Sequence, residues 1–143
     1  MRGPITVDAS VFLNAANPSE TGYGTSRRFL EWLHAERIPV VLPTLVLPEV
    51  AAGSRRISGS EDIARLVAAG VEHLSGAVFV SLDDSLAEAA AHLAMTGGMK
   101  GSDAVYGATA QRFGATLVTL DRQQRTRLPS DIEALSPGEA LER

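Results

Sequence analysis

The stretch Ile5-Thr6-Val7-Asp8-Ala9-Ser10-Val11-Phe12-Leu13 decides the fold. It opens with a short apolar run that contains β-branched residues, which is typical of a buried strand. The run stops at an aspartate, and a helical pattern starts at once with Ser10 in its first turn. A buried strand that leads straight into a helix is typical of βαβ units around a parallel sheet.

The same alternation continues along the chain, with no internal repeat and no change of composition that would divide it. We therefore predict one α/β domain over residues 1–143, with a central parallel sheet of four to five strands. The predicted strands are Pro4–Val7, Pro39–Leu42, Ala77–Leu82, Thr116–Leu120 and, as the weakest, Ile132–Leu135. The predicted helices are Thr25–Glu36, Thr44–Gly53, Ser60–Leu74, Asp84–Thr96 and Ser102–Phe113.

Residue types that start and stop helices stand at the ends of these segments. The predicted N-caps are Thr25, Thr44, Ser60 and Asp84, and the predicted C-terminal glycines are Gly97-Gly98 and Gly114. Two connections are predicted to be loose, Asn17–Gly24 and Gly53–Ser60. The second contains the pair Arg55-Arg56, which we interpret as a mobile basic arm.

The composition excludes several classes of protein. The 143 residues contain no cysteine, so disulfides, cysteine-based zinc sites and thiol nucleophiles are excluded. We find no signal-peptide pattern and no apolar run near the roughly 18 residues that span a bilayer, so we expect a cytoplasmic protein without membrane contact. A pI of about 5.3 and only seven aromatic residues argue against nucleic-acid binding through a broad basic surface.

Four acidic residues stand where a parallel sheet places its ligands. Asp8 and Asp121 each follow a predicted strand, and ligands bind at the carboxyl ends of such strands. Asp103 lies in the first turn of a predicted helix, and Glu49 lies in an apolar helical segment. We expect these four carboxylates to converge at one edge of the sheet.

Each acid also has a plainer explanation. The three aspartates could cap helix N-termini, and Glu49 could pair with Arg55 or Arg56. These explanations do not account for four acids at one edge, where mutual repulsion would raise their pKa values unless a cation intervened. An all-oxygen set without cysteine or paired histidines favours Mg²⁺ or Mn²⁺ over zinc.

Other polar residues receive weaker predictions. His34, His73 and His92 fall in three different helical stretches and are interpreted as surface or core-edge residues. Ser10 could cap a helix, or bind a substrate phosphate or a metal-bound water, and Thr119 shares a strand face with Asp121. No glycine-rich phosphate loop is present, which argues against nucleoside-triphosphate and dinucleotide enzymes.

Four pieces of the sequence together resemble the PIN-domain ribonucleases, in order and over nearly the whole chain. They are Ile5–Leu13, Pro43–Val50, Lys100–Ala104 with the small residues that follow it, and Thr116–Asp121. The likeness is greatest to the VapC-type toxins of bacterial toxin–antitoxin pairs. The chain departs from the family at Gln124, where members often carry an aromatic residue, and this concerns the packing of the final helix.

The resemblance implies a PIN-like α/β/α sandwich that cleaves RNA endonucleolytically with Mg²⁺ or Mn²⁺. It implies that Asp8, Glu49 and Asp103 anchor the ion, and that Asp121 binds it directly or through water. It also implies a homodimer that a cognate antitoxin protein inhibits. The candidate RNA contacts are Ser10, Thr119, Lys100, Arg122 and Arg125, with Arg55-Arg56 as a further possibility.

Two other functions remain open from the residues alone. The same fold could be a non-catalytic interaction module that uses the acidic pocket to bind a partner's cationic side chain. A phosphatase with Asp8 as its nucleophile is less favoured, because Ser10 replaces the second aspartate such enzymes use. For a homodimer we expect the apolar face of Asp84–Thr96 (Leu86, Ala89, Ala90, Leu93 and Ala94) to contribute, with burial in the core as the alternative.

Overall fold

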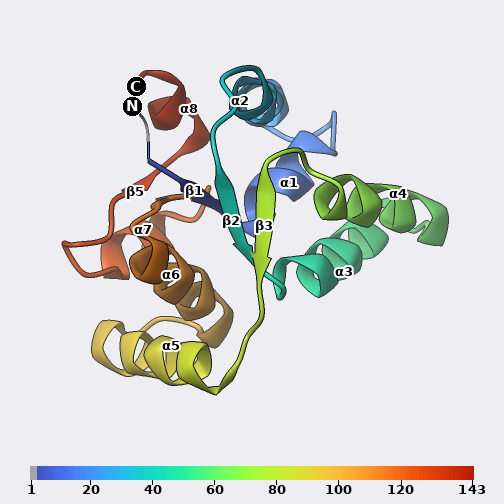
Figure 1. The fold of residues 1–143 in the computed structure, drawn as a ribbon. Helices are drawn as coiled ribbons and strands as arrows, with labels where there is room; N and C mark the ends of the chain where they lie inside the picture. Colours follow the sequence, from blue (N-terminus) through green and yellow to red (C-terminus); the bar gives the residue numbers. More distant parts are fainter. Residues whose placement is uncertain (1–2) are drawn as a thin grey trace.

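The computed structural model describes residues 3–143 and contains a five-stranded sheet (Figure 1). All neighbouring strands are parallel, and their order across the sheet is β3-β2-β1-β4-β5. The strands are β1 (Ile5–Val7), β2 (Val40–Pro43), β3 (Ala77–Val80), β4 (Thr116–Val118) and β5 (Ala134–Leu135). The predicted α/β fold with a parallel sheet is confirmed, although four strands are shorter than expected and β2 is shifted by one residue from the predicted Pro39–Leu42.

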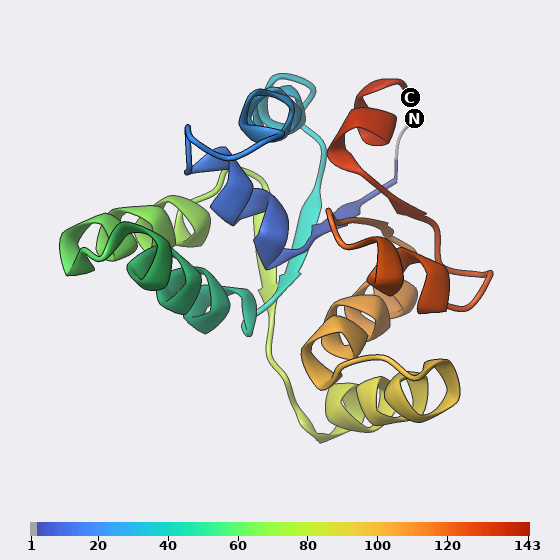
Figure 2. The same cartoon turned by 180° about the vertical axis from the view of Figure 1, so that it is seen from behind.

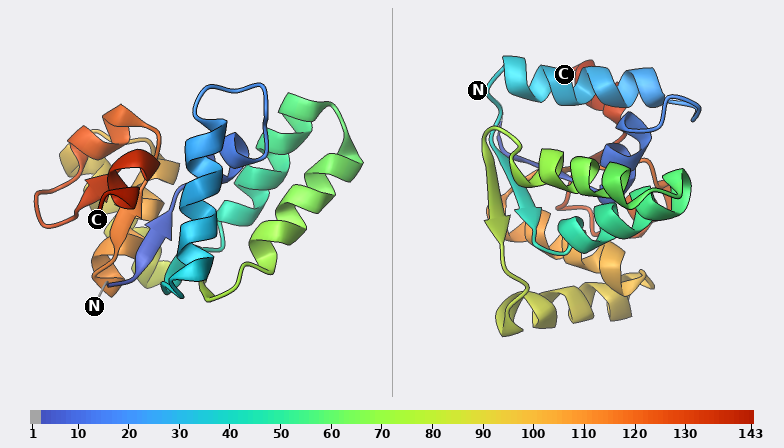
Figure 3. Two further views of the ribbon diagram at one scale, coloured as in Figure 1. Left: turned by 90° about the horizontal axis from the view of Figure 1, so that it is seen from above. Right: turned by 90° about the vertical axis from the view of Figure 1, so that its right-hand side faces the viewer.

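Helices lie on both sides of this sheet. They are α1 (Ala9–Ala15), α2 (Tyr23–Ala35), α3 (Val46–Ser58), α4 (Glu61–Glu72), α5 (Asp84–Gly97), α6 (Gly101–Phe113), α7 (Arg122–Arg127) and α8 (Pro137–Leu141). α6 packs on the central strands with α5 outside it, while α2 and α8 lie together on the opposite side (Figures 1 and 2). α3 and α4 pack against each other as a helical hairpin that projects from the sheet (Figure 3).

The prediction of a loose connection at Gly53–Ser60 is wrong, because α3 continues to Ser58. Gly53 lies inside the helix, where it allows close contact with α1: a Cβ there would stand 2.5 Å from Leu13 Cδ1. The helix ends instead at Gly59, whose φ of 71° is left-handed and suits glycine. The residues expected to form a mobile arm are therefore held on a helix.

Several predicted helix caps are also corrected. Ser60 caps α4 as expected, by accepting a hydrogen bond from the Ile63 amide. Thr25 and Thr44 do not cap their helices, because α2 begins after Gly22 and α3 after Leu45. The cap of α5 is Asp83 and not Asp84, and the predictions at Gly98 and Gly114 are confirmed. The capped C-terminal helix α8 was not predicted.

The sheet topology fixes where a ligand can bind. From β1 the chain adds β2 and β3 on one side of the sheet, and it then adds β4 and β5 on the other side. In parallel sheets, ligands bind at the carboxyl ends of the strands where the order of connection switches in this way, here between β1 and β4. Val7 pairs with Val118, so the residues that follow these two strands emerge side by side. None of the helices in residues 3–143 is long and apolar enough to cross a membrane.

Candidate active site

A pocket of about 420 Å³ opens at the carboxyl edge of the sheet. Three of the four predicted acids line it: Asp8 after β1, Glu49 from α3 and Asp103 from α6. Ser10 and Arg56 line the same pocket. Segments far apart in the sequence therefore bring three of the four predicted carboxylates to one opening, while Asp121 is not among its lining residues.

Asp8 is the most buried of these acids, with 7 % of its surface exposed. Its Oδ2 accepts a hydrogen bond from the Thr119 hydroxyl at 3.0 Å and one from the Ser10 amide at 3.3 Å. The second bond makes Asp8 the N-cap of α1, so the capping explanation is confirmed without removing the residue from the pocket. Burial raises the pKa of Asp8, and the hydrogen bonds oppose that rise.

Glu49 is held by a residue that the sequence analysis missed. The Tyr106 hydroxyl donates to Glu49 Oε1 at 2.6 Å, and Tyr106 is fully buried in α6. Burial raises the pKa of Glu49, the tyrosine bond lowers it, and the charge of Asp8 raises it. The alternative that Glu49 pairs with Arg55 or Arg56 finds no support among the ion pairs of the described residues. A usable signal was the position of Tyr106, three residues after Asp103 and thus on the same helix face.

Asp103 lies in the first turn of α6, but the N-cap of that helix is Lys100. The capping explanation for Asp103 is therefore wrong. Burial raises the pKa of Asp103 to about 6, and the charges of Asp8, Asp121 and Glu49 add to the rise. Lys100 opposes it. Asp103 thus responds electrostatically to all three of the other acids.

Asp121 is the N-cap of α7, as the plainer explanation proposed. Its Oδ1 accepts hydrogen bonds from the Gln123 amide at 2.9 Å and the Gln124 amide at 3.2 Å. Both bonds fall on one oxygen. The charge of Asp121 nonetheless reaches Asp103, so this carboxylate stands at the edge of the acidic cluster.

The predicted substrate-contact residues occupy different environments. Ser10 lines the pocket, and its Oγ accepts a hydrogen bond from the Leu120 amide at 3.2 Å. Thr119 is fully buried, so its hydroxyl reaches Asp8 and not the surface. Arg125 Nη1 donates to the Thr119 carbonyl at 3.2 Å and lies 3.9 Å from Glu139 Oε1. Lys100 and Arg122 are exposed, as are all three histidines.

The fit of a divalent cation to this cluster follows from its donors. No group of three or more His, Asp or Glu side chains within residues 3–143 is arranged to hold a metal ion. The acids form an open cluster and not a closed coordination shell. Mg²⁺ prefers oxygen donors, keeps several waters and binds through one or two carboxylates, so an open cluster of carboxylates fits a hydrated ion.

Comparison with known families agrees with this architecture. The family model of the PIN domain matches residues 5–127. The chain belongs to the PIN domain family. This PIN domain carries the four acids within the matched residues. The comparison with curated proteins finds no match.

Solved structures share the fold of this PIN domain at low sequence identity. VapC20 from Mycobacterium tuberculosis, described as a sarcin–ricin loop cleaving toxin, is 21 % identical with a TM-score of 0.72, over 85 % of this chain and 93 % of that one. VapBC2 from Rickettsia felis, bound to a promoter DNA fragment, is 16 % identical with a TM-score of 0.70, over 92 % and 96 %. FitAcB from Neisseria gonorrhoeae is 20 % identical with a TM-score of 0.69, over 93 % and 97 %.

Proposed function

We propose that this PIN domain is a cytoplasmic endoribonuclease that uses Mg²⁺ or Mn²⁺, and that it is the toxin of a toxin–antitoxin pair. The observation that carries the proposal is the pocket shared by Asp8, Glu49 and Asp103, whose pKa values are all raised. Like charges held together in a partly dry pocket favour the binding of a cation. The similarity to a solved toxin that cleaves the sarcin–ricin loop supports RNA as the substrate.

In this proposal the acids serve as ligands and positioning groups. A bound divalent cation would polarise the phosphoryl oxygen and lower the pKa of a coordinated water. Asp8, Glu49 and Asp103 would hold the ion, while Thr119 and Tyr106 fix the first two carboxylates in place. The Asp121 oxygen that carries neither cap bond would orient the attacking water.

The experiment that tests this function measures cleavage of a labelled single-stranded RNA by the purified protein. We expect cleavage with Mg²⁺ or Mn²⁺, none with chelator, and recovery when the metal is restored. Internal products would identify an endonuclease. A protein that binds these metals but leaves RNA of every tested sequence intact would contradict the proposal and favour the non-catalytic interaction module.

Arg56 is the basic residue best placed to meet the RNA backbone. It lies on α3, seven residues after Glu49 and so on the same helix face, and it lines the acidic pocket. A phosphodiester is an anion that the acids repel, so a cation at the rim would offset this repulsion. Lys100 and Arg122 would extend the contact, whereas Arg125 is already engaged by Thr119 and Glu139.

We expect Arg56→Ala to raise KM for RNA about three- to tenfold with little change in kcat, since a phosphate contact supplies binding that is equal in the ground and transition states. Arg55→Ala is the matched control, because Arg55 is adjacent and exposed but does not line the pocket. The Arg56 variant should also show a shallower salt dependence of RNA binding. Equal KM values for the two variants would remove Arg56 from the binding surface.

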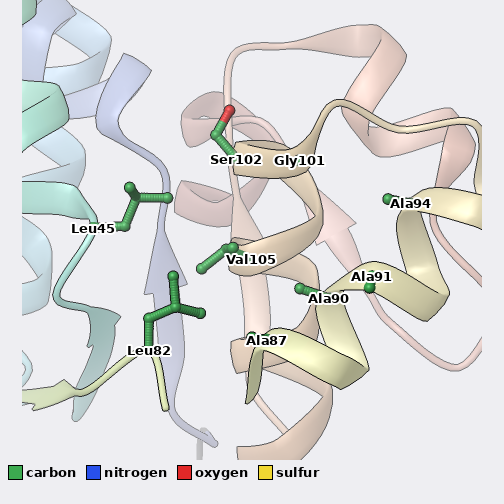
Figure 4. A pocket seen from close by; sticks show the side chains of 9 residues that line it. All are labelled: Leu45, Leu82, Ala87, Ala90, Ala91, Ala94, Gly101, Ser102 and Val105. Carbon is green, nitrogen blue, oxygen red and sulfur yellow. The ribbon is translucent and has the colours of Figure 1, made fainter. Parts of the chain in front are cut away.

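A homodimer is proposed through a second, apolar groove. The alternative of core burial is confirmed for Leu86, Ala90 and Leu93, which are buried. The part of α5 that stays exposed forms one wall of a groove of about 410 Å³ (Figure 4). The groove is lined by Leu45, Leu82, Ala87, Ala90, Ala91, Ala94, Gly101, Ser102 and Val105. The groove is lined mostly by apolar side chains, and its small alanine side chains would let a helix of a second copy approach closely.

We expect light scattering to give a dimer at tens of micromolar and Ala91→Glu to shift it to a monomer, because a charge would be buried at the contact. Ala69→Glu on α4 is the matched control, an exposed alanine on a helix outside the groove. A monomeric wild-type protein would contradict the dimer. A co-expressed antitoxin should inhibit cleavage in competition with RNA or metal; a toxin–antitoxin complex from Klebsiella pneumoniae is among the similar structures.

A further inference from the structure

Gln124 is a polar residue with a buried side chain. It lies in the short helix α7, yet only 1 % of its surface is exposed. A buried amide persists where its donors and acceptor find partners. The hydrogen-bond partners of Gln124 are Thr119, Asp103 and Asp121, which are themselves acids of the candidate site or contact one of them.

The Gln124 side chain joins the segments that carry two of the acids. Its Oε1 accepts a hydrogen bond from the Thr119 hydroxyl at 2.8 Å, and this hydroxyl also stands 3.0 Å from Asp8 Oδ2. Its Nε2 donates to the backbone carbonyl of Asp103 at 3.3 Å. That carbonyl only accepts, so it fixes which end of the amide faces Thr119.

The Gln124 backbone reaches a third acid, because its amide donates to Asp121 Oδ1 at 3.2 Å. The Asp121 amide in turn donates to Thr119 Oγ1 at 3.1 Å. One buried residue therefore links the end of β1, the first turn of α6 and the start of α7. These are the places from which Asp8, Asp103 and Asp121 extend.

We propose that Gln124 is a positioning residue that sets the spacing of Asp8, Asp103 and Asp121 through its bonds to Thr119, Asp103 and Asp121. The inference rests on the proposed cation site. The single hydroxyl proton of Thr119 has two acceptors beside it, Asp8 Oδ2 and Gln124 Oε1. When Asp8 binds a cation, Gln124 Oε1 can therefore accept this proton instead. Residues that hold metal ligands in place typically change metal affinity about 10- to 100-fold when they are lost.

The test measures Mn²⁺ dissociation constants by electron paramagnetic resonance of free Mn²⁺, a readout that does not require cleavage. Gln124→Met keeps the length of the side chain and removes its amide. We expect it to weaken Mn²⁺ binding about 10- to 100-fold. Gln123→Met is the matched control. The Gln123 side chain is exposed, and its backbone amide, which the substitution keeps, also donates to Asp121. The control should bind Mn²⁺ within about twofold of wild type.

A double-mutant cycle separates positioning from general damage to the fold. Thr119→Val removes the hydroxyl between Gln124 and Asp8. Because the two side chains share the bond between Thr119 Oγ1 and Gln124 Oε1, the double variant should lose less Mn²⁺ affinity than the two single losses added together. Independent, additive losses would overturn the proposal, as would a Gln124→Met protein that binds Mn²⁺ like wild type.

Nuclear magnetic resonance of the wild-type protein covers the case in which Gln124→Met does not fold. The Gln124 side-chain amide should shift on Mg²⁺ addition with the same midpoint as the Asp103 amide, while the Gln123 side chain stays unchanged. An unresponsive Gln124 would overturn the proposal. A wild-type protein that binds Mn²⁺ with this response but cleaves no RNA would overturn the proposed function and leave the positioning role supported, whereas one that binds no Mn²⁺ would overturn both.

Discussion

Asp103→Asn is expected to reduce the rate of metal-dependent RNA cleavage by about a thousandfold while leaving the protein folded. A carboxylate that helps hold a divalent cation contributes several kcal/mol of transition-state stabilisation, and about 4 kcal/mol corresponds to a thousandfold in rate. Single-turnover cleavage of labelled RNA at saturating Mg²⁺ measures this loss. Circular dichroism establishes that the variant retains its helices and strands.

The same substitution is expected to make the metal-free protein more stable. Burial and three neighbouring carboxylates raise the pKa of Asp103 to about 6, so its charge is unfavourable in the folded state at pH 7. Removing the charge should add about 1 kcal/mol to the free energy of unfolding, after allowance for the solvent screening of a partly exposed group. Urea denaturation with excess chelator measures this gain.

Asp84→Asn is the matched control for both measurements. Asp84 also lies in the first turn of a helix, but it is exposed and lies outside the pocket. Its loss should leave cleavage unchanged and lower stability slightly, since an acid near a helix N-terminus is favourable. An Asp103→Asn protein that still cleaves RNA would contradict the ligand role of Asp103. One that loses stability in chelator would indicate a structural role instead.

The second large effect is a reversal of the pH dependence of stability by Mg²⁺. The folded protein protonates Asp103 near pH 6, whereas the unfolded chain does so near the ordinary value of 3.8. Between these values the folded state binds more protons, so the free energy of unfolding rises as the pH falls. Asp8 and Glu49 have raised pKa values and act in the same direction. The metal-free protein should therefore be more stable at pH 5 than at pH 7.5.

Mg²⁺ should invert this order, because it binds the ionised carboxylates of the folded state. At a concentration one hundred times its dissociation constant, it would add about 2.7 kcal/mol. We expect this gain at pH 7.5 and its loss by about pH 5, where protons compete for the same oxygens. Thermal unfolding across this range with Mg²⁺ or with chelator measures both curves. Parallel curves would contradict a metal site made of these acids.

Much of the site was predictable because its residues stand at the ends of local elements. Asp8 directly follows β1, Asp121 comes three residues after the end of β4, and parallel strands bring their carboxyl ends to one edge. The prediction failed where a local signal had two interpretations. Gly53 indicated the end of a helix, but its missing side chain allows α1 to approach α3 closely.

The sequence by itself determined the alternation of strands and helices and the acidic edge of the sheet, because both follow from hydrophobic periodicity and chain order. Only the tertiary structure decided which groups hold those acids. The bond between Tyr106 and Glu49 spans 57 positions, and the Thr119 hydroxyl beside Asp8 depends on the register of β1 on β4. Burial of Gln124 against α6 likewise arises from packing between distant segments, and no local pattern encodes such contacts.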